Sequence, residues 1–258
     1  MNPTPMLVDL KGRHALVTGG GMGIGSALCI GLARCGATVV VNYSRSEKGA
    51  EETVEEIKAE GGRAIAVKAD ITDEDQVEQL VDTSLREFGG LHILVANAGG
   101  PTEHKPTVDL EEEDWNRGMG INCKSVFYCV KHTVPHLPDT TGRIIINSSG
   151  SGRSGAGPGM ITYAASKGAV NNMVRCWAKE YGARGTTVNA IAPGPIWTRI
   201  FKGNIDQKAY DEIIARSPLG RFGEPEDCVG PVLLLASDDG SYINGQVIEV
   251  GGGIIMPS

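Results

Sequence analysis

The chain has 258 residues, of which 41% are hydrophobic, 5% aromatic and 21% charged, and it contains 36 glycines. This is the composition of a globular protein that buries roughly 70 to 75% of its unfolded surface, and it favours one large α/β domain over an all-β sandwich. The formal net charge of −7 argues against nucleic acid or an anionic membrane surface as a partner.

Residues 1–14, MNPTPMLVDLKGRH, contain no apolar core of a signal peptide. No stretch of the sequence reaches the roughly 18 apolar residues that a membrane-spanning helix needs. The six cysteines form no C-x-x-C pair and no zinc-like spacing with the five histidines. We therefore expect free thiols, no metal site and a cytoplasmic protein without membrane contact.

From residue 14 onward, short β-branched runs alternate with stretches of helical periodicity. Each helix that links two parallel strands covers one face of the sheet, so this alternation predicts right-handed βαβ units. The expectation is one Rossmann-type doubly wound α/β domain over residues 1–258, with a seven-stranded parallel sheet flanked by helices on both faces. We expect strands within the runs 14–18, 37–42, 63–70, 92–99, 143–149, 186–193 and 246–250, and helices at about 22–34, 51–60, 73–88, 115–136, 162–181 and 225–236.

Two segments interrupt the alternation. Residues 150–159 are rich in glycine and serine, and residues 197–224 form a long insertion after the sixth strand. Both follow the carboxyl ends of strands, where doubly wound sheets bind ligands. A loop this long in a compact domain is usually a lid or binding loop, so we expect a substrate lid at about 197–224, centred on 199–217.

The first predicted strand is followed directly by T18-G-G-G-M-G-I-G25 and then by an apolar helix. Phosphate groups bind backbone N–H groups at a helix N-terminus, and residues without side chains allow the close approach. Gly19, Gly23 and Gly25 have the required places. A glycine motif alone is weak evidence, but a strand before it and a helix after it strengthen the prediction of a dinucleotide site.

The spacing T-G-x-x-x-G-x-G resembles the glycine motif of the classical short-chain dehydrogenases/reductases. Further motifs of that family follow in order, and the resemblance extends from about residue 10 to residue 253. They are Asp70 after the third strand, A96-N-A-G99 after the fourth, Asn122, Ser149, Y163-x-x-x-K167 and P193-G-P-I-W-T198.

The resemblance implies a nicotinamide dinucleotide cofactor. It implies that Asp70 and Ile71 contact the adenine ring, that residues 97–99 line the nicotinamide ribose, and that residues 193–198 meet the carboxamide and phosphate. The cofactor-binding residues expected in this way are Gly19, Gly21, Met22, Gly23, Ile24, Gly25, Asn42, Ser44, Arg45, Asp70, Ile71, Asn97, Ala98, Gly99, Tyr163, Lys167, Pro193, Gly194, Ile196 and Thr198.

The end of the second strand indicates which nicotinamide cofactor is used. An NAD site places a carboxylate there for the ribose 2′-OH, and a carboxylate would repel a 2′-phosphate. The sequence V40-V-N-Y-S-R-S46 has no acidic residue, and Asn42, Ser44 and Arg45 are suited to surround a 2′-phosphate. Met22 stands where many NADP-using relatives carry a basic residue. On balance, we expect NADP(H) in preference to NAD(H).

Tyr163 and Lys167 lie four residues apart on a predicted helix, so their side chains share one face. A phenol with a pKa of about 10 is a poor base near neutrality, but an adjacent ammonium group favours the phenolate. We therefore expect Lys167 to lower the pKa of Tyr163, and the resemblance implies that it also holds the nicotinamide ribose. Tyr163 is the expected proton donor or acceptor.

Ser149 follows the strand RIIINS and is placed to donate to the substrate oxygen as charge develops there. Its distance of 14 residues from Tyr163 is one more than is usual in the family, so Ser148 and Ser151 are alternatives, although alignment on the strand favours Ser149. The hydroxynaphthalene reductases, which the sequence also resembles at Asn42 and the following tyrosine, share this longer loop.

The resemblance implies one further catalytic residue, Asn122, which should distort its helix and anchor a water that relays protons to Lys167. It also implies a homotetramer. Residues 251–253 are G-G-G where many relatives carry Asp before paired glycines, a departure expected to affect C-terminal or subunit contacts but not the chemistry.

Together these features predict an oxidoreductase that interconverts a ketone and a secondary alcohol. Trp197 and Phe201, with Ile200, would form an apolar wall beside Ser149, Ser151 and Tyr163, which favours a cyclic or aromatic ketone or a 3-oxoacyl compound. Enoyl reductases of the same superfamily place the lysine further from the tyrosine, and the extended epimerases need a larger C-terminal domain. A dinucleotide sensor without turnover is the non-enzymatic alternative.

Overall fold

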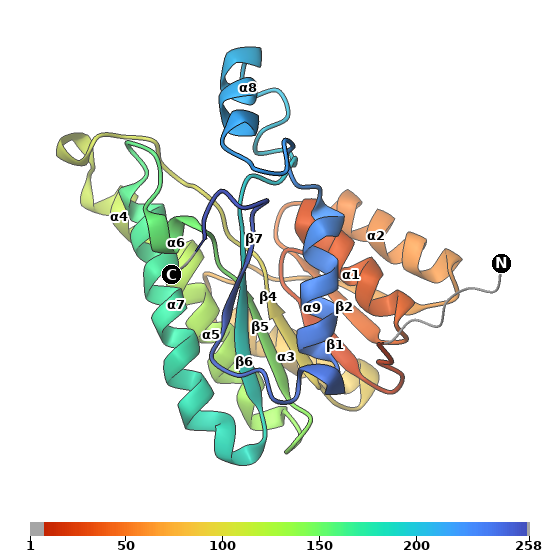
Figure 1. The fold of residues 1–258 in the computed structure, drawn as a ribbon. Coiled ribbons are helices and arrows are strands. Elements are labelled where there is room, and N and C mark those ends of the chain that lie inside the picture. Colours follow the sequence, from red (N-terminus) through yellow and green to blue (C-terminus); the bar gives the residue numbers. More distant parts are fainter. Residues whose placement is uncertain (1–7, 257–258) are drawn as a thin grey trace.

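The computed structural model describes residues 8–256, so the first seven residues of the N-terminal stretch considered above lie outside it. A seven-stranded parallel sheet with the order β3-β2-β1-β4-β5-β6-β7 forms the centre (Figure 1). This confirms the predicted fold class. The strands are β1 (His14–Val17), β2 (Thr38–Tyr43), β3 (Arg63–Lys68), β4 (Ile93–Ala96), β5 (Arg143–Asn147), β6 (Thr187–Pro193) and β7 (Val247–Val250).

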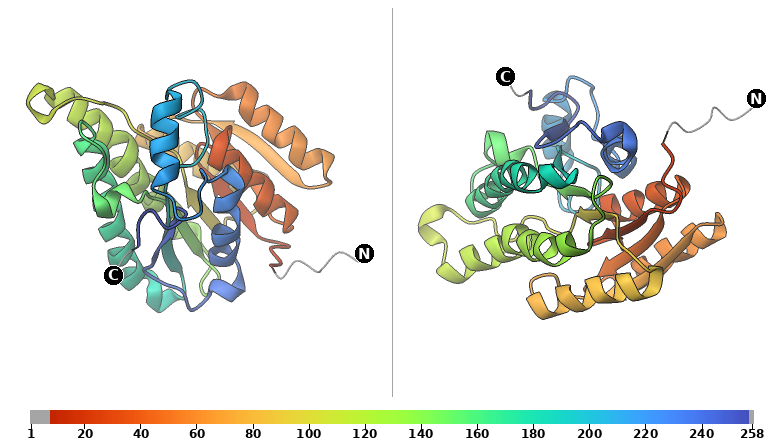
Figure 2. Two further views of the ribbon diagram at one scale, coloured as in Figure 1. Left: turned by 45° about the horizontal axis from the view of Figure 1, so that its top comes forward. Right: turned by 90° about the horizontal axis from the view of Figure 1, so that it is seen from below.

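Helices cover both faces of this sheet (Figure 2). Consecutive strand residues point to opposite faces, so Val17 packs with α1, α2 and α9, whereas Leu16 packs with α3, α5 and α7. The helices are α1 (Gly23–Arg34), α2 (Glu47–Ala59), α3 (Glu74–Phe88), α4 (Glu112–Met119), α5 (Ser125–Thr133), α6 (Ser151–Ser154), α7 (Ile161–Tyr181), α8 (Gln207–Ala215) and α9 (Val229–Ala236).

The helix expected over 115–136 is interrupted at the point where Asn122 was expected to distort it. A π-helical turn, Gly120–Lys124, separates α4 from α5. The Asn122 side chain is fully buried and donates from Nδ2 to the carbonyl oxygens of Gly118 (3.1 Å) and Gly100 (2.9 Å). This amide competes with regular backbone hydrogen bonding, which accounts for the local widening of the helix.

The insertion at 197–224 contains a helix that the sequence analysis did not predict. α8 begins after Asp206, whose side chain accepts a hydrogen bond from the backbone N–H of Ala209 (2.8 Å) and so caps the helix. α8 stands beyond the carboxyl edge of the sheet, apart from the two layers of covering helices (Figure 1). The predicted helix at 225–236 also differs, because it opens with a 3-10 turn, Pro225–Cys228.

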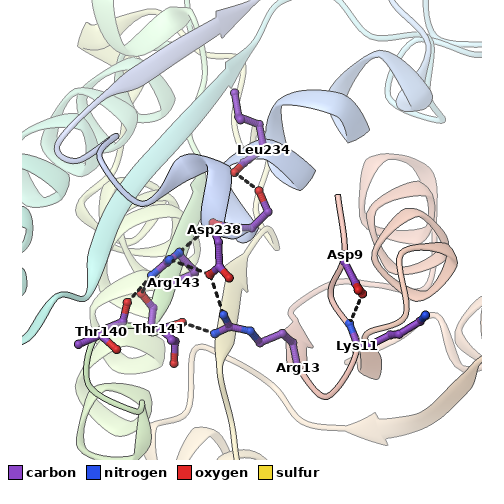
Figure 3. Close-up of polar contacts among 10 residues, drawn as sticks. Asp9, Lys11, Arg13, Thr140, Thr141, Arg143, Leu234 and Asp238 are labelled. Atoms are coloured by element: carbon purple, nitrogen blue, oxygen red, sulfur yellow. Dashed lines mark hydrogen bonds and ion pairs between the residues drawn. The ribbon is translucent and has the colours of Figure 1, made fainter. Parts of the chain in front are cut away.

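At the amino edge of the sheet, Arg143 is almost completely buried. Figure 3 shows its polar contacts. Its guanidinium donates to three backbone carbonyls, those of Thr140, Gly142 and Ser237. Asp238 accepts a hydrogen bond from Arg13 (2.8 Å) and lies 3.5 Å from Arg143. These contacts satisfy the buried charge and close the end of the sheet remote from the strand termini that hold the site.

Within residues 8–256, no helix is both long and apolar enough to cross a membrane. The same residues include no group of three or more His, Cys, Asp or Glu side chains arranged to hold a metal ion. All six cysteines are free thiols, and four of them are buried.

Candidate active site

Four loops meet where the carboxyl ends of β1, β4, β5 and β6 lie side by side. The Thr18 hydroxyl, after β1, accepts hydrogen bonds from the backbone N–H groups of Asn97 and Ala98, both at 3.0 Å. Lys167 reaches the end of β5, where its Nζ donates to the carbonyl oxygen of Asn147 (2.8 Å). The sheet order reverses between β1 and β4, so the site occupies the switch point at which doubly wound folds bind ligands.

The glycine-rich turn has the conformation and the space that a bound pyrophosphate requires. Gly19 and Gly23 have φ angles of +64° and +53°, and a Cβ on Gly25 would lie only 2.1 Å from the carbonyl oxygen of Gly19. Met22 precedes α1 without a side-chain cap, and the first turn of α1 carries no acidic residue. The positive end of this helix therefore faces the turn without a competing negative charge, which suits an anionic ligand.

The segment after β6 approaches the same turn. A Cβ on Gly23 would lie 3.3 Å from Cγ2 of Thr198. Ile196 is buried and pairs with Gly223, so its side chain belongs to the core, and only its backbone can face a ligand. Gly194 packs so closely on Gly251 that a Cβ at residue 194 would come within 2.8 Å of the Gly251 Cα. The glycine at residue 251 therefore contacts the β6 loop.

The Asn42 side chain was expected to face a ligand beyond the end of β2, but it points into the protein interior. Its side chain is buried, with Oδ1 accepting from the backbone N–H of Gly19 (3.3 Å) and Nδ2 donating to the carbonyls of Val67 (3.3 Å) and Ala69 (3.1 Å). These bonds saturate the amide inside the protein. The expected contact between Asn42 and a 2′-phosphate is wrong, and the residue instead fixes the glycine turn to β2 and β3.

Ser44 and Arg45 are exposed at the end of β2, as a contact with a 2′-phosphate would require. Two neighbours of Arg45, Ser46 and Lys48, were not predicted to lie here, because α2 begins at Glu47 rather than near residue 51. A hollow at this point is lined by Gly21, Met22, Arg45, Ser46, Glu47, Lys48, Gly49, Glu51 and Glu52. Lys48 adds a second cation to the hollow, and Glu52 lies 3.7 Å from it.

Asp70 and Ile71 follow β3, the neighbour of β2 in the sheet. One carboxylate oxygen of Asp70 accepts hydrogen bonds from the backbone N–H (2.9 Å) and the hydroxyl (2.8 Å) of Thr72. Ile71 is buried against the face of the sheet that α3 covers. The structure therefore places both residues at the carboxyl edge expected for the adenine end of the site, with Asp70 held in its loop.

The N-A-G segment connects the strands around the site. The Asn97 amide donates to the Thr18 carbonyl (2.9 Å) and accepts from Nδ2 of Asn147 (2.8 Å), so it links β1, β4 and β5. Gly99 has a φ angle of +149°, and a Cβ there would lie 2.7 Å from Oδ1 of Asn122 and 3.6 Å from Nζ of Lys167. Only glycine permits this close approach.

Lys167 lies on the buried face of α7, one turn after Tyr163. Its Nζ is 5.8 Å from the centre of the Tyr163 ring. Burial lowers the pKa of the Lys167 ammonium to about 8. The lysine therefore keeps its charge at neutrality but gives up a proton far more readily than an exposed lysine.

The expected lowering of the pKa of Tyr163 by Lys167 is not found. Burial raises the pKa of Tyr163, and the hydrogen bond with the Ser149 side chain lowers it only in part. The reason is geometric, because the ammonium donates to the Asn147 carbonyl and faces the ring of the tyrosine. In the protein by itself, the phenol therefore stays protonated at neutral pH.

The structure separates the three candidate serines. The Ser149 side chain lies close enough to Tyr163 to lower the pKa of its phenol, and its Oγ accepts from the backbone N–H of Ser151 (3.1 Å). Ser148 instead donates to Oδ1 of Asn171 in the protein interior (2.6 Å). Ser151 is half-buried at the start of α6. Ser149 is thus brought together with Tyr163, and Ser148 is directed away from it.

The lid has an aromatic core. Trp197 packs edge-to-face on Tyr210 and Phe222, with ring centres 5.2 and 5.0 Å apart, and Phe201 packs on Phe222 at 5.3 Å. Trp197 and Phe201 were expected to face the substrate, but these ring contacts are made inside the lid. The sequence analysis missed Tyr210 and Phe222, although all four aromatic residues fall within the predicted lid.

Ile200 is the lid residue that reaches across the site. A Cβ on Gly100 would lie 3.9 Å from its Cδ1, so the side chain extends to the loop after β4. The two stems of the lid are joined by a bond from the backbone N–H of Trp197 to the carbonyl of Gly223 (2.7 Å). The predicted lid therefore stands on a defined base beside the loops that follow β4 and β6.

The loop after β4 is held by charged residues that the sequence did not mark. Lys105 pairs with the buried Asp114 and holds its pKa below the usual range, and Arg117 pairs with Glu103. The backbone N–H of Lys105 donates to the carbonyl of Gly159 (3.0 Å). These contacts join residues 101–106 to the loop that precedes Tyr163.

Residues 19–255 match the family model described as "Enoyl-(Acyl carrier protein) reductase". A hydroxynaphthalene reductase-like protein, Arp2 of Metarhizium brunneum, is 40% identical over 259 residues, covering 96% of each chain. The match therefore includes every loop of the site described above.

Solved structures of dehydrogenases and reductases are also similar to this chain over nearly its whole length. A dehydrogenase/reductase from Sinorhizobium meliloti superimposes with a TM-score of 0.91 at 34% identity, covering 96% of this chain and 97% of its own. A short-chain dehydrogenase from Burkholderia cenocepacia in complex with NADP has a TM-score of 0.89 at 35% identity, covering 95% and 98% of the two chains.

Proposed function

Because the chain belongs to the classical short-chain dehydrogenase/reductase family, we propose that it is an NADP(H)-preferring enzyme that interconverts a ketone and a secondary alcohol. The observation that carries the proposal is the meeting of Ser149, Tyr163 and Lys167 at the carboxyl ends of β4 and β5, beside the glycine-rich turn. The oxidoreductase class follows from the family, whereas the roles, cofactor preference and substrate are inferred.

Nicotinamide, when bound, supplies or accepts the hydride. In reduction, Tyr163 donates its hydroxyl proton to the oxygen that becomes the alcohol. Its raised pKa keeps the phenol protonated at neutral pH, as an acid requires. Ser149 donates a hydrogen bond to the same oxygen as negative charge develops there. In oxidation, Tyr163 must first lose its hydroxyl proton, and the phenolate then accepts the proton of the alcohol while Ser149 donates to the same oxygen.

Lys167 holds its charge close to Tyr163 and, in this proposal, binds the nicotinamide ribose. Asn122 positions the loop opposite, because its Oδ1 accepts from the backbone N–H of Gly100 (2.8 Å). The Asn122 amide is engaged with Gly100 and Gly118, so a relay water anchored here would use a backbone carbonyl of the π-helical turn.

The cofactor preference is inferred from the hollow after β2. Arg45, Ser46 and Lys48 line it together with three glutamates of α2, Ser44 is exposed at the end of β2, and the strand itself ends without the carboxylate typical of an NAD site. The Burkholderia relative bound to NADP supports this choice. The residues that would hold the rest of the cofactor are those of the glycine turn, Asp70, Ile71, Asn97, Ala98, Gly99, Pro193, Gly194, Ile196 and Thr198.

The substrate class is inferred from the lid. Ile200 gives an apolar contact across the site, and the aromatic core of Trp197, Phe201, Tyr210 and Phe222 supports it. Together with a hydroxynaphthalene reductase-like relative, this favours a cyclic or aromatic ketone, with a 3-oxoacyl compound as the second choice. A homotetramer is proposed from the family. A cytoplasmic location is proposed because the six cysteines are free thiols, as is usual in a reducing compartment.

Reduction of a C=C bond is the competing chemistry, since it stands in the description of the matching family model. The spacing of four residues between Tyr163 and Lys167 favours the ketone reductases instead. A dinucleotide sensor would not need the Ser149 side chain beside Tyr163. The alternatives can therefore be separated by activity: an enoyl reductase would reduce a C=C bond, and a sensor would bind the dinucleotide without reducing any substrate.

The test is oxidation of NADPH and of NADH with a panel of cyclic diketones, aryl ketones, quinones, 3-oxoacyl thioesters and enoyl thioesters, with Tyr163→Phe as the control. We expect turnover of a ketone, a lower KM for NADPH than for NADH, and loss of turnover in the variant. Turnover of the enoyl thioester alone, or cofactor binding without any turnover, would replace the proposal by one of its alternatives.

A further inference from the structure

α6, the single helical turn that follows Ser149, is held between two elements. On the α7 side, Gly152 lies so close to the catalytic helix that a Cβ on it would come within 2.7 Å of the carbonyl of Lys167. On the β7 side, Nη2 of Arg153 donates to the carbonyl oxygen of Val247 (2.7 Å). α6 therefore acts as a spacer between the catalytic helix and the last strand of the sheet.

Arg153 also forms an ion pair with Glu249 of β7. Its Nε lies 3.2 Å from Oε1 of Glu249, as an ion contact rather than an aligned hydrogen bond. The Glu249 side chain is 11% exposed, and its second oxygen faces Gly150, where a Cβ would lie 3.4 Å away. A carboxylate buried this deeply is destabilising without a compensating charge, and Arg153 supplies that charge.

The position of α6 decides how the Ser149 hydroxyl is oriented. The backbone N–H groups of Arg153 (3.0 Å) and Ser154 (3.1 Å) donate to the Gly150 carbonyl, and that of Ser151 donates to Oγ of Ser149. The bond from Ser151 occupies one lone pair of the Ser149 oxygen. The hydroxyl hydrogen and the second lone pair must therefore point in the remaining directions. A shift of α6 would redirect the hydroxyl away from Tyr163.

We propose that Arg153 and Glu249 are positioning residues for the reaction. Their ion pair holds α6 at the distance from α7 at which the Ser149 hydroxyl meets Tyr163 and the substrate oxygen. The catalytic consequence rests on the proposed function, whereas the hold on α6 is a property of the fold. Displacement of a catalytic group by about 1 Å lowers rates by about a hundredfold, so loss of the pair need not unfold the protein to be felt.

The experiment uses Glu249→Gln, which removes the charge and keeps the shape of the side chain. We expect kcat to fall at least about tenfold while the KM for the ketone and the affinity for NADPH stay unchanged. Amide hydrogen exchange in residues 148–156 should accelerate in the same variant, with or without turnover. Asp139→Asn is the matched control, because Asp139 pairs with Arg184 on the surface, at 2.9 Å.

Arg153→Lys and Arg153→Met provide the second comparison. Lysine keeps the charge, so it should recover part of the kcat that methionine loses. A lower thermal stability of Glu249→Gln with unchanged kcat, or unchanged hydrogen exchange in residues 148–156, would overturn the proposal. If the wild-type protein reduces no carbonyl compound, the proposed function fails separately, and hydrogen exchange alone then decides whether the pair holds α6.

Discussion

Nζ of Lys167 and the carbonyl oxygen of Asn147 are hydrogen-bonded at 2.8 Å, so this lysine is tied to the end of β5 in the protein interior. Burial lowers its pKa from 10.5 to about 8. Between these values the unfolded chain binds more protons than the folded protein, so stability rises with pH across this window.

Replacement of Lys167 by methionine removes this titration. We expect the unfolding free energy of the wild type to increase relative to Lys167→Met by at most about 3 kcal/mol as the pH rises from 8 to 10.5. Urea unfolding at several pH values measures the difference. Parallel profiles for the two proteins would show that the lysine is not desolvated.

The second prediction separates two residues that lie close together in the sequence but act differently. Asn42→Ala removes the acceptor for Gly19 and leaves buried carbonyls without their donor. We expect it to destabilise the protein by about 1 to 3 kcal/mol and to weaken NADPH and NADH binding alike. Arg45→Ala, at an exposed residue, should weaken NADPH binding selectively and leave stability unchanged. Calorimetric titration with both cofactors gives the comparison, and a selective loss of NADPH in Asn42→Ala would contradict it.

The fold and part of the candidate site could be predicted from the sequence, but the direction of the Asn42 side chain could not. The order of strands and helices follows from alternating periodicity, because each strand must be buried and each crossover helix must cover it. The places of Tyr163 and Lys167 follow from the regular geometry of one helix. The direction of the Asn42 side chain does not, because a polar residue at a strand end can turn outward to a ligand or inward to backbone groups of neighbouring strands.

The sequence also could not predict contacts between segments that lie far apart in the chain. Arg153 and Glu249 come from elements far apart in the chain, and neither residue has a sequence pattern that marks it. The helix α8 was missed because its polar face resembles a loop, and because its stabilising contacts come from Trp197 and Phe222 outside it. Packing therefore decides what local propensity leaves open.

The third prediction concerns pH and the amino edge of the sheet. Nδ1 of His92 accepts a hydrogen bond from the backbone N–H of His14 (3.2 Å), which requires an unprotonated ring nitrogen. Burial, followed by the charges of His14 and Arg13, lowers the pKa of His92 below its ordinary value of 6.5. The unfolded chain therefore takes up this proton first, and stability falls as the pH drops below 6.5.

His92→Asn keeps an acceptor for His14 but does not titrate. We expect its unfolding free energy to depend less on pH than that of the wild type below pH 6.5, with similar stability at pH 8. Thermal unfolding across this range measures the effect. A variant that loses the same stability on acidification would assign the pH dependence to other groups.

The last prediction tests whether the aromatic core holds the lid in place. Phe222 is buried and contacts Trp197, Phe201 and Tyr210, so truncation to alanine removes the centre of the cluster. A buried Phe→Ala change costs about 3 to 5 kcal/mol, and segments over binding sites open locally at free energies below that of global unfolding. We expect the KM for the ketone to rise about tenfold or more, with the sheet remaining folded.

Limited trypsin digestion gives an independent measure, because the exposed Lys202 and Lys208 lie within the lid. Cleavage there should be faster in Phe222→Ala than in the wild type. Leu219→Ala is the matched control, since Leu219 is 68% exposed in the same segment and contributes no ring to the cluster. Equal cleavage and equal KM in the two variants would mean that the lid is held by its hydrogen-bonded stems at Trp197 and Gly223, and that the ring contacts contribute little to its closure.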